Sequence, residues 1–231
     1  MFTEGAGVPY PLFLDICTYS IRDYQKTCQM KIFGIGRNYA EHIKELGNER
    51  PEEPVIFLKP DTALLKDNQP FYYPDFSSDV HFEVEIVLRI SREGKHLEEK
   101  FAHKYYDAIG IGIDFTARDL QQKAKQKGLP WALAKGFNGS APVSGFLPKE
   151  GFDLQNLHFG LQVNGELRQQ GTTSHMIFSF DYLVAYLSRY FTLKKGDLIF
   201  TGTPEGVGPV KQGDRLTAFI EKQTLLDFEV K

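Results

Sequence analysis

Two glutamates occupy alternate positions of one apolar run, and this spacing brings their carboxylates to the same side of a strand. In the run 80–90, Glu83 and Glu85 share one face, while the alternating apolar residues from Phe82 onward share the other. Side chains at i and i+2 on one face lie roughly 7 Å apart. Two carboxylates at that separation repel unless water solvates the face or a cation lies between them. The pattern therefore indicates either a site for a hard divalent ion with oxygen ligands or the exposed polar face of an edge strand.

A third carboxylate and two basic residues could serve the same chemistry, and each also has a purely structural explanation. Asp114 ends the run 108–114, whose alternate glycines indicate close approach of another backbone or a ligand. It is either a further ligand or a turn residue at the strand end. Arg118 falls in the first turn of a predicted helix, where a cation opposes the macrodipole unless an acidic side chain or a substrate carboxylate pairs with it. Lys135 interrupts an apolar run, so its ammonium either extends to the surface or points into a polar site.

Short strands and few helices must position these residues. Hydrophobic patterns predict strands at 31–36, 55–60, 80–90, 108–114, 157–163, 198–201 and 216–220, and helices over 38–46, from about 101, over 116–127 and over 180–190. Capping boxes are predicted at the pairs Asn38–Glu41 and Thr116–Asp119, with Gly47 as the stop of the first helix. Many short strands joined by glycine and proline turns indicate a β-rich α+β domain.

The composition argues against several classes of protein. The 231 residues include 27 Lys and Arg against 30 Asp and Glu, a net charge of -3, and no clustered basic stripe marks a nucleic-acid partner. The two cysteines form neither a disulfide framework nor a metal-ligand pair. No stretch approaches the ~20 apolar residues of a membrane span, and the N-terminus lacks the pattern of a signal peptide. We therefore expect a soluble, cytoplasmic globular protein with no membrane partner.

Seven short motifs follow one another along the chain. They are Gly36–His42 (GRNYAEH), Phe57–Pro60 (FLKP), His81–Glu85 (HFEVE), Asp114–Asp119 (DFTARD), Gly128–Trp131 (GLPW), Val163–Glu166 (VNGE) and Thr201–Gly208 (TGTPEGVG). In this order they resemble the fumarylacetoacetate hydrolase superfamily, above all its small single-domain members of the acylpyruvase and oxaloacetate decarboxylase type. The resemblance implies a mixed β-sandwich roll assembled as a homodimer. It covers residues 30–231, the expected catalytic domain, and leaves residues 1–29 as an N-terminal extension.

The resemblance also implies a metal site. Mg²⁺ or Mn²⁺ would be held by Glu83, Glu85 and Asp114. This all-oxygen set suits a hard ion, leaves coordination positions open to water or substrate, and disfavours zinc. The remaining residues implied for the site are His42, Glu45 and Lys135 as catalytic, and Arg37, Arg118, Gln121 and Thr203 as substrate-binding.

His42 and Glu45 match the dyad on the lid helix of acylpyruvase-like members. They stand at i and i+3, so they are neighbours on one helix face. A helix this short is marginal in isolation, so we expect it to order when substrate closes the site. The alternative is an exposed histidine that merely pairs with Glu45 on the surface.

The activity implied by the resemblance is metal-dependent chemistry on small 2-oxo acids. Hydrolysis of an acylpyruvate and decarboxylation of oxaloacetate would pass through the same metal-stabilised pyruvate enolate. His42, oriented by Glu45, would deprotonate the attacking water, and Arg118 would hold a substrate carboxylate. One alternative is an isomerase or tautomerase acting on a dienol diacid of the 2-hydroxyhepta-2,4-diene-1,7-dioate type. A second alternative is a non-catalytic, β-rich binding module with a structural metal.

Overall fold

The computed structural model describes residues 30–45 and 50–231 and confirms the β-rich α+β class. Its larger sheet has six strands in the order β2 (Val55–Lys59), β1 (Ile32–Gly36), β12 (Leu198–Phe200), β5 (Val84–Ile90), β6 (Tyr106–Ile113) and β9 (Leu147–Pro148). β1 and β12 run parallel, and the other neighbours in this sheet are antiparallel.

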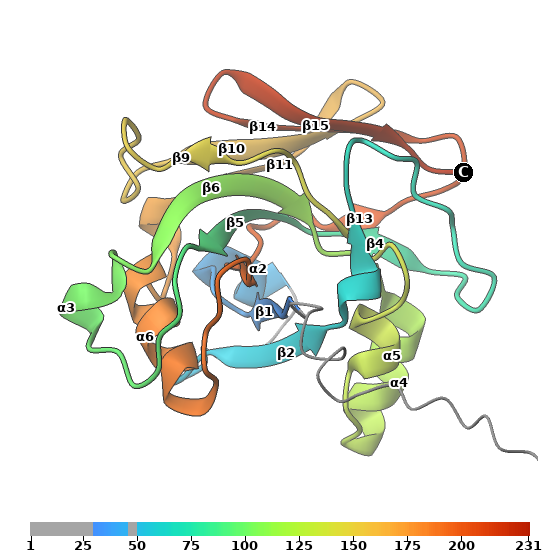
Figure 1. Cartoon of the computed structure of the whole chain (residues 1–231). Helices are drawn as coiled ribbons and strands as arrows, with labels where there is room; N and C mark the ends of the chain where they lie inside the picture. Colours follow the sequence, from blue (N-terminus) through green and yellow to red (C-terminus); the bar gives the residue numbers. More distant parts are fainter. Residues whose placement is uncertain (1–29, 46–49) are drawn as a thin grey trace, which may run out of the picture.

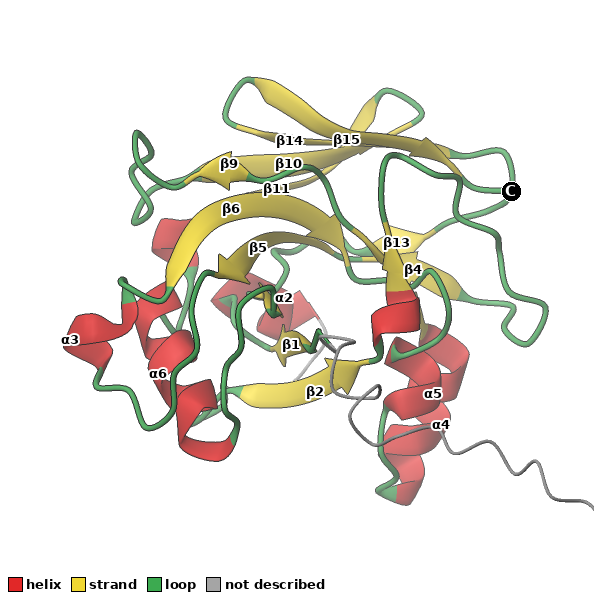
Figure 2. Ribbon diagram, viewed as in Figure 1, coloured by secondary structure: helices red, strands yellow, loops and turns green. Residues whose placement is uncertain are grey.

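A smaller antiparallel sheet lies over the larger one, next to β6 (Figures 1 and 2). Its strand order is β11 (Glu166–Thr172), β10 (His158–Val163), β14 (Arg215–Ile220) and β15 (Gln223–Glu229). Asn164 and Gly165 both have positive φ angles, 54° and 82°, as the two-residue turn between β10 and β11 requires. Along β14 the buried residues alternate with less buried ones, so one face of this sheet covers the core between the layers.

Helices close the two ends of the sheet stack (Figure 1). At one end α6 (Phe180–Tyr190) packs with α3 (Glu99–Ala102), and the Ser179 hydroxyl caps α6 by accepting from the Tyr182 amide. At the other end lie α4 (Arg118–Lys127) and α5 (Ala132–Lys135), and α4 stops where Gly128 adopts a left-handed φ of 63°. The short helix α2 (Ala40–Glu45) follows β1.

The remaining elements are small. A three-stranded sheet has the order β13 (Gly208–Pro209), β4 (Val80–Phe82) and β7 (Thr116–Ala117), and β3 (Leu64–Leu65) pairs with β8 (Ala141–Pro142). Two 3₁₀ turns, η1 (Asp61–Ala63) and η2 (Thr173–His175), complete the described elements.

The predicted strand over 80–90 is two strands, because the chain changes sheet at Glu83. β4 pairs with β7 and β13, whereas β5 joins the larger sheet. Between them the Glu83 carbonyl accepts from the Asp114 amide, and the Val84 amide donates to the Gln169 side chain. The break turns Glu83 and Glu85 into the interior, where they are 6% and 1% exposed. The exposed edge-strand explanation is therefore wrong.

Both predicted capping boxes are wrong, although the helices that they were meant to open exist. The Asn38 side chain points away from α2: it donates to the carbonyls of Phe178 and Thr201 and accepts from the Phe178 amide. Thr116 turns its hydroxyl toward Glu83, and α4 begins without a side-chain cap. In each case a distant buried partner replaces the local amide that the capping rule assumes.

Some predictions fall outside the described residues, and several strands were not predicted, two of them long. Residues 1–29 and Gly47 lie outside, so the domain boundary at Met30 stays a prediction. The sequence patterns also gave no strand for β11 or β15, each of which has exposed polar residues at three of its seven positions. Among the described residues, no helix is long and apolar enough to cross a membrane.

Candidate active site

Three buried carboxylates meet where two of the sheets join. Glu83 lies at the junction of β4 and β5, Glu85 lies in β5, and Asp114 follows the end of β6. Each offers an oxygen within 4.8 Å of the others. Gly112 pairs with Glu85 across the β5–β6 ladder, and a Cβ there would lie 2.6 Å from the Phe200 ring. The close approach expected at the glycines of β6 is thus made by a side chain of β12.

Two of the carboxylates are surrounded by cations. The Lys135 ammonium lies 2.8 Å from Glu83 Oε2 and 2.5 Å from Asp114 Oδ2, so this lysine points into the polar site and not to the surface. Arg118 Nη2 lies 2.7 Å from Glu83 Oε1, so the anionic partner that its helix position requires is a neighbouring side chain. Burial raises the pKa of Glu83, but the charges of Lys135 and Arg118 outweigh burial and bring it below its ordinary value.

Lys135 keeps its charge in this environment. Burial lowers the pKa of its ammonium, but the charges of Asp114 and Glu83 raise it above the ordinary lysine value. Its ammonium also donates to the Thr116 hydroxyl at 2.5 Å and lies 4.9 Å from the centre of the Phe57 ring. Lys135 is therefore a fixed positive charge against the carboxylate cluster.

Glu85 differs from its neighbours. Its carboxylate accepts from the Gly202 amide at 2.6 Å, but no ammonium or guanidinium of the described residues forms an ion pair with it. Burial, followed by the charges of Asp114 and Glu83, raises the pKa of Glu85 well above its ordinary value. An added cation would relieve this cost most directly at Glu85.

The three carboxylates fit a hard divalent ion. All donors are oxygens, and no histidine or cysteine belongs to the cluster within the described ranges. Asp114 Oδ1 is buried and accepts no well-directed hydrogen bond from the described residues, although the Lys59 ammonium lies 2.7 Å away. Among the possible metal ligands of the cluster, this oxygen and the Glu85 carboxylate are the two that hydrogen bonds and ion pairs of the described residues satisfy least.

The predicted dyad is formed, and its histidine lines the same cavity as the carboxylates. His42 is only 5% exposed, and its Nδ1 lies 3.1 Å from Glu45 Oε2. The Gly206 amide donates to the Glu45 carboxylate, at 3.2 and 3.3 Å from its two oxygens. Nε2 is left as the ring nitrogen that can exchange a proton with a bound molecule. The surface-histidine explanation does not hold, because His42 is buried.

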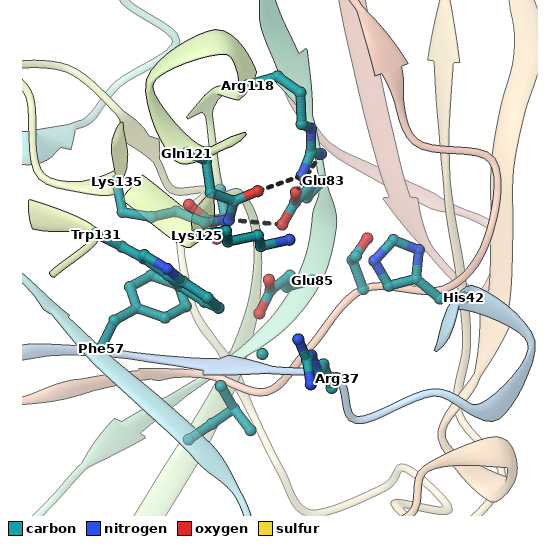
Figure 3. Close-up of a pocket in the computed structure, with 14 residues that line it drawn as sticks. Arg37, His42, Phe57, Glu83, Glu85, Arg118, Gln121, Lys125, Trp131 and Lys135 are labelled. Atoms are coloured by element: carbon teal, nitrogen blue, oxygen red, sulfur yellow. Dashed lines mark hydrogen bonds and ion pairs between the residues drawn. The ribbon is translucent and has the colours of Figure 1, made fainter. Parts of the chain in front are cut away.

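One cavity, partly open to solvent, brings these groups together (Figure 3). It is lined by Ile35, Gly36, Arg37, His42, Phe57, Glu83, Glu85, Asp114, Arg118, Gln121, Lys125, Trp131, Lys135 and Thr203. Every residue predicted for the site lines it except Glu45, which stands behind His42. Gln121 accepts from Arg118 at 2.8 Å, and the Thr203 hydroxyl accepts from Gln169.

Sequence analysis missed several residues around this cavity. Lys59 is fully buried: its ammonium faces Asp114 and donates to the carbonyl of Lys135 and to the Ser140 hydroxyl. Burial is the main cause that lowers the pKa of Lys59 below its ordinary value. The available signal was a lysine at the end of an apolar strand, directly before a proline. Lys125 and Trp131 also line the cavity, and neither was predicted for the site.

Comparison with known proteins places this site in context. A family model described as "Fumarylacetoacetate (FAA) hydrolase C-terminal" matches residues 31–231. The chain is 47% identical over 197 residues to the oxaloacetate tautomerase YcgM of Escherichia coli, covering 84% of this chain and 90% of that protein. It is 47% identical over 185 residues to the mitochondrial oxaloacetate decarboxylase of Dictyostelium discoideum, covering 79% and 85%.

A solved structure gives the same fold. The fumarylpyruvate hydrolase of Pseudomonas aeruginosa, crystallised with Mn²⁺ and pyruvate, superposes with a TM-score of 0.83 and is 35% identical. The match covers 87% of this chain and 89% of that one. A catalytic domain of this family thus has the sheet arrangement described above.

Proposed function

The chain belongs to the fumarylacetoacetate hydrolase family, and on that premise we propose a metal-dependent enzyme that hydrolyses acylpyruvates, decarboxylates oxaloacetate, or does both. Each reaction releases pyruvate as its enolate. The observation that carries the proposal is one cavity with a buried three-carboxylate cluster and the His42–Glu45 dyad. A structural ion alone would not account for the dyad or for the buried Lys135.

Glu83, Glu85 and Asp114 are the proposed holders of Mg²⁺ or Mn²⁺. Their all-oxygen chemistry and their burial support this assignment, as does the Mn²⁺ in the Pseudomonas aeruginosa structure. When bound, the ion supplies Lewis-acid stabilisation of negative charge that develops on a substrate oxygen. The preference between Mg²⁺ and Mn²⁺ is to be measured with the purified protein, by activity with each ion.

Two residues of the chain are proposed to act in cleavage of the C3–C4 bond of the substrate, His42 on the C4 side and Lys135 on the enolate side. For an acylpyruvate, His42 takes a proton from water, the resulting hydroxide adds to C4, and the C3–C4 bond breaks with its electron pair on C3. The products are a carboxylic acid and the pyruvate enolate, which takes up a proton at C3. For oxaloacetate, CO₂ leaves from C4 and no water is needed. The fixed charge of Lys135 favours the enolate in both reactions.

Four further residues are proposed to bind substrate. Arg37, Gln121 and Thr203 line the cavity, and Arg118 adds a guanidinium to it. Two nitrogens of Arg118 are already engaged by Glu83 and Gln121. Its role toward a substrate carboxylate therefore uses the donors that remain, and its contact with Glu83 also fixes that carboxylate.

A second candidate is tautomerisation of oxaloacetate between its keto and enol forms. The similarity to the oxaloacetate tautomerase of Escherichia coli favours it. This reaction needs only removal of a proton from C3 and its return to oxygen, or the reverse, and it breaks no carbon–carbon bond. His42 could move that proton with the same geometry.

A product assay on Mg²⁺-loaded protein separates these functions. The substrates are acetylpyruvate, oxaloacetate, fumarylpyruvate and a dienol diacid, side by side. We expect pyruvate from acetylpyruvate, oxaloacetate, or both, at a rate that falls when Mg²⁺ is removed. Loss of the enol absorbance of oxaloacetate without pyruvate would assign the tautomerase. Conversion of the dienol diacid alone would assign an isomerase, and no turnover would leave a binding module.

Assembly and location complete the proposal. We expect a homodimer, as the family resemblance implies, and sedimentation velocity would measure it. We also expect a cytoplasmic location, as the sequence analysis predicts. Cell fractionation tests this directly, since the Dictyostelium discoideum relative is named as mitochondrial.

A further inference from the structure

One buried side chain of the smaller sheet makes hydrogen bonds to two segments of the active site. Gln169 of β11 is 1% exposed and is not among the residues that line the cavity. Its side-chain oxygen accepts from the Val84 amide at 2.8 Å. Its side-chain nitrogen donates to the Thr203 hydroxyl and to the Pro204 carbonyl, each at 2.9 Å. None of the steps proposed above uses this residue.

A β-bulge turns Gln169 inward. The pairing of β10 with β11 shifts by one residue at this point and leaves Arg168 as an extra residue on β11. Without the bulge, Leu167 and Gln169 would share one face of the strand. Instead Leu167 is 52% exposed and Gln169 is buried. Bulges next to active sites commonly redirect a side chain, and this one turns a polar amide toward the segments that form the cavity.

The loop after β12 packs tightly against β11. A Cβ at Gly171 would lie 2.9 Å from the Pro204 ring, and a Cβ at Gly206 would overlap the carbonyl oxygen of Arg168. Gly206 also has a φ of 90°, a conformation that residues with a side chain rarely adopt. Close backbone contacts therefore hold this loop at hydrogen-bonding distance from Gln169.

The backbone partners of Gln169 fix the direction of its amide. A backbone N–H can only donate and a backbone carbonyl can only accept, so the Gln169 oxygen faces Val84 and its nitrogen faces Pro204. The second hydrogen of that nitrogen points at Thr203, in the same loop, and the Thr203 oxygen is therefore the acceptor. Among the residues that the structure describes, none accepts the Thr203 proton in return. Thr203 is buried and lines the cavity, so a bound molecule is the partner available to that proton.

We propose that Gln169 is a positioning residue, which makes the Thr203 hydroxyl a hydrogen-bond donor to a carboxylate oxygen of the bound 2-oxo acid. The inference rests on the proposed function for its ligand, a 2-oxo acid held at the carboxylate cluster. Val84 stands between the two glutamates of that cluster, so the same side chain ties Thr203 to the segment of the proposed metal ligands. One amide thus sets both the direction of this donor and its place relative to the cluster.

A double-mutant cycle on pyruvate binding tests this role. Thr203→Val removes the donor but keeps the shape of the side chain. Gln169→Glu keeps the side-chain length and an oxygen for the Val84 amide, but it has at most one hydrogen and cannot donate to both Thr203 and Pro204. Affinities of pyruvate for the Mg²⁺-loaded variants are measured by calorimetry, and thermal melts show that each variant is folded. Gln169→Met, which has no donor and no charge, gives the same cycle if Gln169→Glu does not fold.

We expect the two single variants to lose affinity to a similar extent. Thr203→Val and Gln169→Glu should each weaken pyruvate binding about tenfold, as the loss of a hydrogen bond to a charged group does. The double variant should bind no more weakly than Thr203→Val alone, because Gln169 acts through the hydroxyl that is then missing. Thr203→Ser keeps the hydroxyl and should stay within about threefold of wild type. Gln170→Glu, an exposed neighbour on β11, is the matched control and should stay within about twofold.

Two results would overturn the inference. One is undiminished pyruvate binding in Gln169→Glu. The other is an equal loss from Gln169→Glu whether residue 203 is wild type or carries Thr203→Val, because a merely structural role would add to the loss of the hydroxyl. The Mg²⁺-induced shift in melting temperature should persist in Gln169→Glu. Its disappearance would mean that the variant acts through the metal ligands, and it would also overturn the inference.

Turnover distinguishes a failure of the positioning role from a failure of the proposed function. With acetylpyruvate, Gln169→Glu and Thr203→Val should each raise KM about tenfold and leave kcat within about twofold, because the substrate carboxylate is bound equally before and during reaction. Pyruvate binding that follows the expected cycle, without any turnover, would retain the role of Gln169 and reject the proposed reaction. Turnover together with additive losses of affinity would retain the reaction and reject the role of Gln169.

Discussion

At the residue scale, the three cavity carboxylates differ in the cations around them. Glu83 has two ion-pair partners, Lys135 and Arg118, whereas Glu85 has none among the described residues. Their pKa values are displaced in opposite directions for this reason, downward for Glu83 and upward for Glu85. Glu83 and Glu85 can therefore both be metal ligands and still contribute with opposite sign to the stability of the metal-free protein.

We expect Glu85→Gln to stabilise the metal-free protein and Glu83→Gln to destabilise it. The folded-state pKa of Glu85 lies above its unfolded value, so the charged form weakens the fold, and stability rises as the pH falls through the folded-state pKa toward the unfolded one. Removing the charge should raise the melting temperature by about 3 °C. Glu83→Gln leaves Lys135 and Arg118 undercompensated and should cost about 3 kcal/mol.

Thermal melts in EDTA and in Mg²⁺ check this pair. Both variants should lose most of the Mg²⁺-induced shift, because a ligand stabilises only the state that binds it. Exposed Glu150→Gln is the matched control and should keep the shift. A full Mg²⁺ shift in either cavity variant would remove that residue from the ligand set.

His42→Ala should separate the two proposed reactions. Loss of a positioned general base lowers rates by roughly 10²–10⁴-fold, so acetylpyruvate hydrolysis should fall by that amount. Oxaloacetate decarboxylation should fall far less, since no water is activated. Pyruvate release from both substrates under saturating Mg²⁺ gives the measurement. An equal loss in both reactions would instead assign His42 to shaping the cavity.

Residue types and spacing predicted most of the candidate site, but not its internal pairing. The Glu-x-Glu pattern and Asp114 stand out because buried carboxylates need a cation, and the family motifs supplied His42 and Glu45. Lys59 was missed because its position at the end of an apolar strand, before a proline, is too weak a signal to predict burial. Its depth depends on Asp114, 55 positions later in the chain, and sequence patterns do not report such distances.

At the element scale, one side chain fixes the position of the dyad helix. Asn38, two residues after β1, makes three buried hydrogen bonds to two distant segments at Phe178 and Thr201. Asn38→Ala would leave these backbone groups unpaired and should cost about 3 kcal/mol of unfolding free energy. It should also lower hydrolysis more than decarboxylation, because His42 follows four residues later. Urea unfolding and the two assays test it, with exposed Gln126→Ala as control.

The same residue explains which element predictions failed. Helix α6 was predicted with its observed bounds, since its hydrophobic period and its Ser179 cap are both local. The caps proposed for α2 and α4 were wrong because Asn38 and Thr116 bind partners far away in sequence. β11 and β15 were not predicted, because pairing with neighbouring strands stabilises them. Their exposed polar residues obscure the alternation of apolar and polar residues that is typical of a strand.

At the scale of the whole molecule, the N-terminal segment is expected to be dispensable. The family match begins at residue 31, and every residue of the candidate site follows it. A chain that starts at Met30 should keep its melting temperature within about 2 °C and its Mg²⁺-dependent turnover. The full-length chain is the control for both measurements. A shortened chain that folds but has lost turnover would assign residues 1–29 to the active site.

The parallel pairing of β1 with β12 has a consequence for how the protein is made. β12 lies between β1 and β5 and joins two early hairpins, β1–β2 and β5–β6, into one sheet. A ribosome must therefore synthesise about 200 residues before those hairpins can meet, and until then each has an open edge. Such non-local pairing folds slowly, and open edges recruit other strands. Nascent chains that stall before Leu198 should be the form of this protein that aggregates or needs a chaperone.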